Sequence, residues 1–181
     1  MSAARPLRRR SLPLGGGGAA RGARHRTAVE GDGTAAMKFP TRIPFVETLG
    51  LELLRFENGE SEIAIDLREE LCNSWSVLHG GVTMTLLDVA MAHAARSPGQ
   101  PGVDDSRGVV TIEMKTSFMR PGLGRLVAHG RLLQRTASFA FCEAWLLDAA
   151  GQRIAHATGT FKFLAGLPAG GRKIHRLNAS D

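Results

Sequence analysis

A chain of 181 residues, 43% of them hydrophobic, is long enough to bury the core of one globular domain. No apolar run approaches the roughly 18 residues of a membrane-spanning helix, so we expect no membrane partner. Five of the six net positive charges lie in residues 1–37, where seven arginines face only Glu30 and Asp32. The rest of the chain is close to neutral, which argues against a basic nucleic-acid-binding domain.

Residues 1–36 are rich in glycine, alanine and arginine, a composition that cannot bury a core, and we expect a disordered extension. A twin-arginine or secretory signal would need an apolar stretch after Arg8-Arg9-Arg10, and the following Ser-Leu-Pro-Leu-Gly does not supply one. An Arg-rich transit peptide is an alternative. We favour a plain extension, or a start codon assigned upstream of Met37.

The remainder predicts one compact domain over residues 37–166, followed by a basic tail over 167–181. Asn58-Gly59 between two strand-like segments is a strong signal for a hairpin turn. One long apolar helix among several strands indicates an α+β arrangement, with an antiparallel sheet wrapped around the helix. The spacing of the last four strands is typical of a meander. In chain order, the predicted elements are a lead-in at 42–49, strands at 51–56 and 61–67, a loop at 68–77, a helix at 78–96, a mobile loop at 97–106, and strands at 108–118, 125–135, 138–148 and 152–163.

The two cysteines, Cys72 and Cys142, form neither a CxxC pair nor a metal-ligand spacing, and they do not make a disulfide framework. We therefore expect reduced thiols in a cytoplasmic protein. A nucleophilic role for Cys72 is disfavoured, because no neighbouring cation in the sequence activates it. The histidines at 93, 129 and 156 also lack metal-ligand spacing, and we interpret them as structural.

Asp88 is the one acid in the predicted helix, which is otherwise apolar on all sides and is therefore expected to be buried. A buried carboxylate is costly unless it has a partner or a function. A local ion pair is excluded, because none of the residues one helical turn away is basic. A tertiary partner or a solvated helix face is the structural alternative. The residues one turn away are Met84, Thr85, Met91 and Ala92.

Gly80 and Gly81 follow His79 at the predicted start of this helix. Free N–H groups at a helix N-terminus bind anions or polarise a carbonyl, which in acyl transfer makes an oxyanion hole. The structural alternative is an ordinary turn that the His79 ring only shapes. Asp88 lies about 12 Å from Gly80 along a helix axis, so the two cannot serve one carbonyl within one chain. If both act on one substrate, a second copy supplies the acid, and the protein is a dimer.

The combination of Asn73, His79-Gly80-Gly81 and Asp88 resembles the hotdog-fold acyl-CoA thioesterases of the phenylacetate-pathway (PaaI-like) type. The segments from Val109 to Pro121 and from Gly151 to Phe161 continue the match. The resemblance implies a hotdog fold and a homodimer or homotetramer, the latter a dimer of dimers. It implies thioester hydrolysis without a metal or redox cofactor, coenzyme A being part of the substrate.

The same resemblance implies roles for five residues. The Gly80 amide would polarise the thioester carbonyl, and His79 would support that loop. The partner subunit's Asp88 would act as general base on water or as nucleophile. Asn73 would orient the thioester or the water, and Thr111 would donate a hydrogen bond to the water.

The sequence leaves the acyl group open, aryl or fatty. Four apolar residues are candidates for an acyl pocket and four cations for phosphate binding, although core packing and a solvated surface are their commoner roles. A non-catalytic acyl-CoA-binding module is the alternative function, which Asp88 argues against. A hotdog dehydratase or hydratase would show a different arrangement around a histidine. The candidates are Met84, Met91, Met114 and Phe118 for the pocket, and Lys115, Arg120, Arg125 and Lys162 for phosphates.

Overall fold

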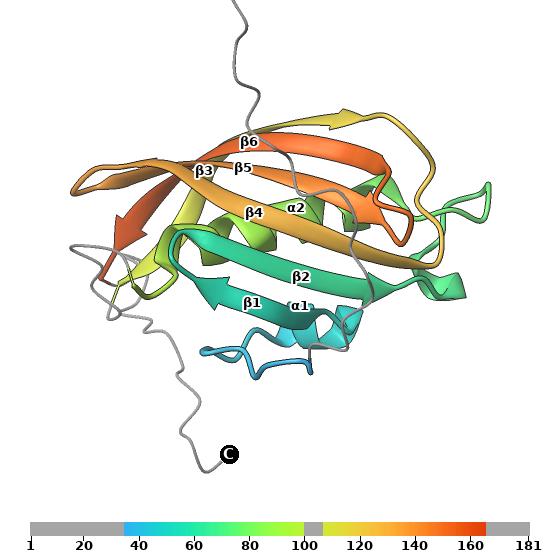
Figure 1. The fold of residues 1–181 in the computed structure, drawn as a ribbon, viewed down its shortest axis with the longest axis horizontal. Helices are drawn as coiled ribbons and strands as arrows, with labels where there is room; N and C mark the ends of the chain where they lie inside the picture. The colour runs from blue at the N-terminus through green and yellow to red at the C-terminus, as the bar shows by residue number, and fades with distance from the viewer. Residues whose placement is uncertain (1–34, 100–106, 166–181) are drawn as a thin grey trace, which may run out of the picture.

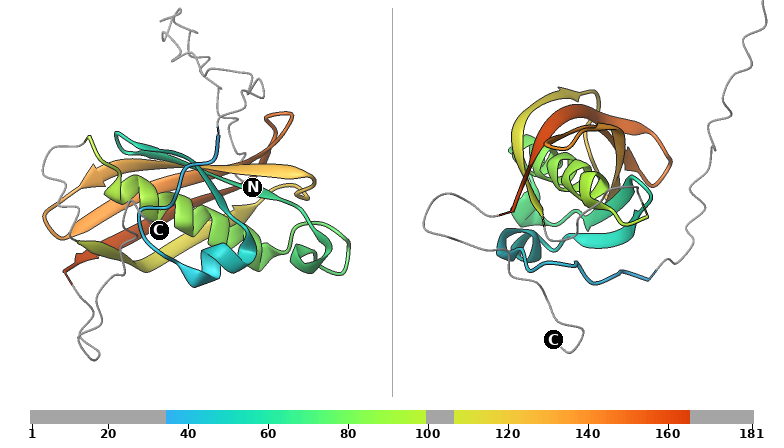
Figure 2. Two further views of the ribbon diagram at one scale, coloured as in Figure 1. Left: turned by 90° about the horizontal axis from the view of Figure 1, so that it is seen from below. Right: turned by 90° about the vertical axis from the view of Figure 1, so that its left-hand side faces the viewer.

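The computed structural model describes residues 35–99 and 107–165. All but the last two residues of the predicted extension, most of the loop predicted to be mobile and the basic tail lie outside these residues. The described part confirms an α+β domain, in which an antiparallel sheet curves around one long helix (Figures 1 and 2). Its elements are α1 (Pro44–Leu49), β1 (Glu52–Glu57), β2 (Glu60–Asp66), a 3₁₀ turn (Glu69–Leu71), α2 (Gly80–Arg96), β3 (Gly108–Phe118), β4 (Arg125–Arg135), β5 (Phe139–Asp148) and β6 (Arg153–Leu164).

The sheet has the strand order β1-β2-β4-β5-β6-β3, and all pairings are antiparallel. The meander predicted for the last four strands holds for β4, β5 and β6 but is wrong for β3. This strand pairs with β6 and forms the far edge of the sheet, while β4 pairs with β2. Local sequence patterns identify strands but do not encode which distant strand each one pairs with.

The turn between β1 and β2 is the predicted two-residue hairpin. Glu57 pairs with Glu60, and both central residues have positive φ, 51° at Asn58 and 82° at Gly59. These values are typical of a type I′ turn, whose twist matches that of the flanking strands.

Helix α2 lies in the concave face of the sheet, which surrounds it in the end-on view of Figure 2. Its closest approach is to β4, where a Cβ on Gly130 would collide with the Ala90 carbonyl. Ser61 of β2 donates a hydrogen bond of 2.6 Å to the same carbonyl oxygen. A glycine at 130 is therefore required by packing. The residues of α2 that are fully buried in the core are Leu86, Leu87, Ala90, Met91, Ala94 and Ala95.

The expectation that α2 is buried on all sides is wrong for its N-terminal half. Gly81 is exposed, Met84 is 39% exposed and Asp88 is only half-buried in a single chain. The sheet does not cover this side of the helix, because β3 ends the sheet there.

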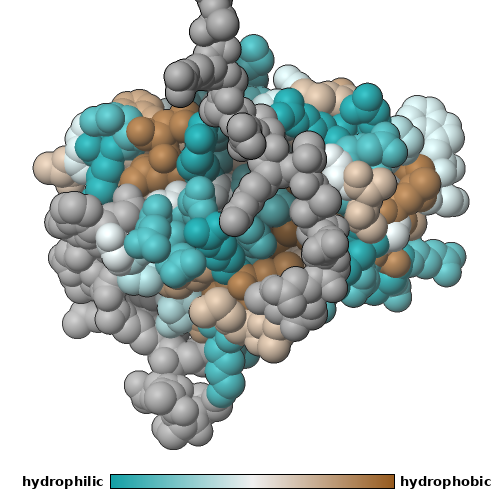
Figure 3. All heavy atoms as spheres, viewed as in Figure 1, coloured by the Kyte–Doolittle hydropathy of each residue, from teal (hydrophilic) through white to brown (hydrophobic). Residues whose placement is uncertain are grey.

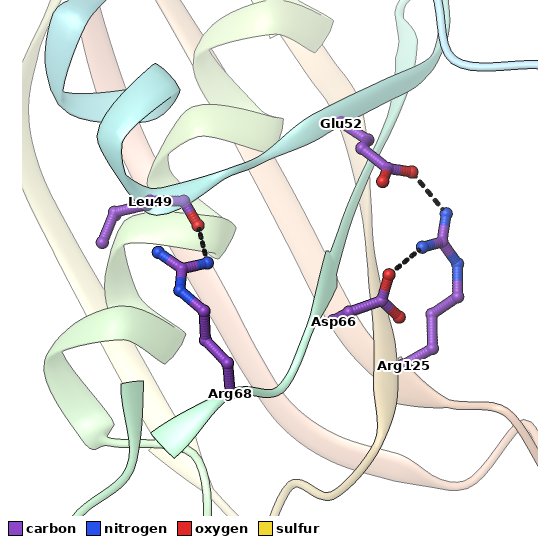
Figure 4. Close-up of polar contacts among 5 residues, drawn as sticks. All are labelled: Leu49, Glu52, Asp66, Arg68 and Arg125. Carbon is purple, nitrogen blue, oxygen red and sulfur yellow. Dashed lines mark hydrogen bonds and ion pairs between the residues drawn. The ribbon is translucent and has the colours of Figure 1, made fainter. Parts of the chain in front are cut away.

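The short helix α1 is held in place mainly from its C-terminal end. Val46 is its buried anchor. The Arg68 guanidinium donates to the Thr48 carbonyl oxygen at 3.0 Å and to the Leu49 carbonyl oxygen at 2.8 Å, the second of which Figure 4 shows. Gly50 follows in the left-handed conformation, which ends the helix. Cations are favourable at a helix C-terminus, so Arg68 stabilises α1 from outside. Within the described residues, no helix combines the length and apolarity needed to cross a membrane.

Candidate active site

The N-terminus of α2 presents backbone N–H groups that the helix itself does not use. His79 caps the helix, and its Nδ1 accepts the Gly81 N–H at 2.9 Å. In the neutral ring the proton therefore lies on Nε2. The Gly80 N–H, at the first position of the helix, has no acceptor among the described residues. This donor lies at the positive end of the helix dipole and can polarise a carbonyl oxygen.

Asn73 organises the loop that leads into this turn. Its Oδ1 accepts the backbone N–H groups of Trp75 and Val77, at 2.9 and 3.4 Å, and its own N–H donates to the Val77 carbonyl. Ser76 within the loop has φ of 57°, an unusual value for serine. The side-chain oxygen of Asn73 is thus engaged in loop structure, which leaves its amide nitrogen as the group that can reach a ligand.

Asp88 and Thr111 form the second polar group of the site. The Thr111 hydroxyl donates a hydrogen bond of 2.7 Å to Asp88 Oδ1. Thr111 faces the helix because it pairs with the buried Phe161 of β6, and a bulge at Ile112 follows it. Burial raises the pKa of Asp88 above its ordinary value, and the Thr111 hydrogen bond opposes this shift without cancelling it. A carboxylate with a raised pKa is a better proton acceptor than an ordinary aspartate.

These two polar groups are separate within one chain. Gly80 and Asp88 lie on the same helix, about 12 Å apart along its axis. Strand β3 runs beside the helix, with Phe118 next to Gly80 at one end and Thr111 at Asp88 at the other. We call these two groups the donor half-site, at His79 and Gly80, and the acidic half-site, at Asp88 and Thr111.

A pocket of about 480 Å³ opens beside Asp88, between α1, α2 and β3. Met84 and Met114 line it, as expected, whereas Met91 is buried in the core and Phe118 lies at the other half-site. No sequence signal pointed to the contribution of α1, because a six-residue helix shows too little periodicity. The remaining lining residues are Ile43, Phe45, Val46, Thr85, Val89, Ala92, His93, Arg96 and Val109.

Two of the four cations considered for phosphate binding have structural contacts. Arg125 bridges Glu52 and Asp66 at 2.6 and 2.8 Å (Figure 4), and Arg120 donates to the Arg153 carbonyl. Figure 3 shows the outer face of the sheet, where apolar side chains lie in separate patches among polar ones.

A family model and curated proteins match this chain. The model described as thioesterase superfamily matches residues 76–155, a range that contains the start of α2, Asp88 and β3. The medium/long-chain acyl-CoA thioesterase YigI of Salmonella typhimurium is 32% identical over 136 residues, covering 68% of this chain and 87% of that protein.

Solved structures resemble the domain as well. A conserved protein of Pseudomonas aeruginosa is 26% identical with a TM-score of 0.64, covering 69% of this chain and 97% of that chain. A mutant of the phenylacetic acid degradation protein PaaI from Thermus thermophilus is 27% identical with a TM-score of 0.58, covering 67% of this chain and 100% of that chain. The resemblance thus extends over whole domains.

Proposed function

Because the chain belongs to the thioesterase superfamily, with the hotdog fold, and is a thioester hydrolase, we propose that it cleaves acyl-CoA at an active site shared by two subunits. The observation that carries this proposal is the separation of the two half-sites on α2. A carbonyl held by the Gly80 amide is out of reach of Asp88 in the same chain, at about 12 Å along the helix axis. The acid must then come from a second copy.

The edge strand β3 suggests how two copies would meet. Its outer edge is unpaired among the described residues, and such an edge readily pairs with another strand. Antiparallel pairing of two β3 strands would set the Phe118 end of one copy beside the Thr111 end of the other. Each Gly80 amide would then approach the partner subunit's Asp88, which gives two equivalent sites per dimer. A dimer of dimers is compatible with this arrangement.

In the proposed reaction the thioester carbonyl oxygen accepts the Gly80 N–H. The partner subunit's Asp88 takes a proton from water, and the water oxygen attacks the carbonyl carbon. The tetrahedral intermediate then breaks its C–S bond, and the proton passes to the departing sulfur. The products are a carboxylic acid and coenzyme A, and no metal or redox cofactor takes part.

Direct attack by Asp88 is the alternative to water activation. It would form an anhydride with the carboxylate, which water would then hydrolyse. A single turnover in ¹⁸O-labelled water separates direct attack by water from an anhydride that water opens at the aspartyl carbon. Direct attack by water labels the acid product, whereas opening of the anhydride at the aspartyl carbon puts the label on Asp88 and leaves the first acid product unlabelled. In both routes Thr111 holds the carboxylate, Asn73 orients the thioester or the water, and His79 fixes the turn.

The pocket beside Asp88 supports an extended acyl group. Its lining is mainly aliphatic and follows α2 from Met84 to Arg96. The name of YigI, a medium/long-chain acyl-CoA thioesterase, agrees with an aliphatic chain in this space. Our proposal therefore favours a fatty-acyl over an aryl group. A cytoplasmic location, with Cys72 and Cys142 reduced, is part of the same proposal.

Thiol release from a panel of fatty-acyl-CoAs and aryl-CoAs tests the function. We expect turnover that falls by about 10²- to 10⁴-fold in Asp88→Ala and in Asp88→Asn, because both remove the proton acceptor. Asp66→Asn, a change to an exposed carboxylate of β2 outside the site, is the matched control. Binding of acyl-CoA without turnover would support the non-catalytic alternative, and turnover unaffected by both Asp88 variants would refute our mechanism.

A further inference from the structure

His93 is a buried histidine in the wall of the pocket. It lies on α2, it is only 3% exposed, and it lines the pocket together with Asp88. Two aromatic rings meet it edge-on: Phe39 with ring centroids 5.3 Å apart and Phe56 with centroids 5.6 Å apart. The imidazole is therefore held in one orientation.

The hydrogen bonding of His93 determines which of its nitrogens carries the proton. Nδ1 lies 2.8 Å from the Val89 carbonyl oxygen, and a carbonyl oxygen can only accept, so the proton is on Nδ1. Burial lowers the pKa of His93 to about 4, helped by the positive charge of Arg96 and opposed by the Val89 hydrogen bond. The ring is thus neutral at pH 7, and Nε2 carries a bare lone pair.

This lone pair has no partner among the described residues, although the Nε2 atom is buried. Buried polar atoms are nearly always hydrogen-bonded, and an exception in a native protein calls for an explanation. Core packing does not supply one, because phenylalanine at this position would complete the same aromatic cluster without an unpaired acceptor. His93 lines the pocket, and a ligand that brings a donor to Nε2 would supply the missing partner.

We propose that His93 Nε2 accepts a hydrogen bond from a hydroxyl group on the acyl chain, so that the preferred substrates are hydroxylated aliphatic acyl-CoAs. This inference rests on the proposed function. His93 lies five residues beyond Asp88, or about 7.5 Å along the helix, so the hydroxyl is remote from the thioester carbonyl. The aliphatic lining residues Ile43, Val46 and Ala92 fit a chain around it.

The same geometry discriminates against other polar groups. A keto oxygen or a terminal carboxylate offers only lone pairs, which cannot bond to Nε2. A site built around a substrate hydroxyl also disfavours the analogue that lacks it, because the acceptor is then left unpaired. The expected order of preference is therefore hydroxyacyl, then unsubstituted acyl, with ketoacyl and dicarboxylic acyl last.

The test compares fatty-acyl-CoAs of one chain length that carry a hydroxyl, a keto group or no substituent at the same remote position. For the wild type we expect the best-placed hydroxyl to raise kcat/KM about tenfold over the unsubstituted chain. His93→Phe keeps the aromatic cluster but removes the acceptor, so this ratio should fall to about one. Met91→Leu, a core change on α2 outside the pocket, is the control and should keep the wild-type ratio.

Binding gives an independent readout. In the full-length Asp88→Asn protein, calorimetry should show tighter binding of the hydroxyacyl-CoA than of its unsubstituted analogue, and adding His93→Phe should abolish the difference. Equal binding, or a preference that survives His93→Phe, overturns the inference, as does a preference confined to ring-hydroxylated aryl-CoAs. Asp88-dependent hydrolysis without any hydroxyl preference would refute this inference alone. If no thioester is hydrolysed, the proposed function itself is refuted.

Discussion

The surroundings of Asp88 set the pH range in which the proposed enzyme works. Both routes need the ionised carboxylate, so activity should rise with pH through the pKa of Asp88. Burial raises the pKa of Asp88 above that of an ordinary aspartate, which is about 3.9. The acid limb of the kcat/KM profile should therefore lie at a higher pH than it would for an ordinary aspartate. The Thr111 hydrogen bond favours the ionised form and opposes this rise in pKa.

Removing the Thr111 hydroxyl therefore gives a signed prediction. Thr111→Val should raise the pKa of Asp88 further and move the acid limb of the kcat/KM profile to higher pH. Thr111→Ser keeps a hydroxyl and should leave the limb near its wild-type position. Thiol release measured from pH 4 to 9 gives the position of the acid limb in the wild type and in both variants. An unchanged limb in the valine variant would show that Asp88 is not the group that titrates.

At the level of single residues, the sequence predicted several features of the site but not their contacts. The glycine turn before a helix and the lone acid within it were both visible, because they depend on local order. The contact between Thr111 and Asp88 joins residues far apart in the chain, and only the resemblance suggested a role for Thr111. The pocket position of His93 had no signal, because a buried histidine looks the same in any apolar helix.

At the level of elements, the helix and all strands were predicted to within a few residues, since their periodicity is local. The position of β3 at the sheet edge was not predicted. It depends on pairing with β6, a strand far along the chain. Because β3 ends the sheet, the sheet does not continue over the side of α2 that carries Asp88.

Helix α1 gives a prediction about acyl-chain length. Phe45 and Val46 of α1 line the pocket, as does Ile43 just before the helix, yet six residues cannot hold a helix without outside support. Arg68→Gln removes the charge that stabilises its C-terminal carbonyls (Figure 4). We expect kcat/KM to fall about three- to tenfold for long acyl chains, at a typical 0.5–1.5 kcal/mol per hydrogen bond, and to change little for acetyl-CoA.

Arg125→Gln is the matched control for this experiment. The side chains of Arg68 and Arg125 are 42% and 40% exposed. Arg125 contacts two carboxylates, and Arg68 contacts two carbonyl oxygens of α1 and the Glu70 carboxylate. Arg125 holds Glu52 and Asp66 (Figure 4), and none of these three residues lines the pocket. Its loss should leave the chain-length profile unchanged. If both variants lower kcat/KM equally for every chain length, Arg68 contributes only to the overall stability of the protein.

At the level of the whole molecule, the proposed active unit is a dimer, and its two half-sites can be inactivated separately. Gly80→Pro removes the donor N–H at the first helical position, where proline is well tolerated. His79 has φ of −62° and ψ of 138°, a conformation that suits a residue before proline. Loss of this donor should lower kcat about 10²- to 10³-fold. Gly80→Ala keeps the N–H, and its Cβ would meet Phe118 at an ordinary 3.6 Å, so it is the control.

Mixed dimers then test whether the site is shared. A dimer of one Gly80→Pro subunit and one Asp88→Asn subunit has one site with both defects and one site with none. Random mixing in equal amounts should therefore restore about a quarter of wild-type activity, since half of the dimers are mixed and half of their sites are intact. Coexpression with two different affinity tags isolates the mixed dimer, which should reach half of the wild-type rate. If each chain carried a complete site of its own, both subunits would remain defective and no activity would return.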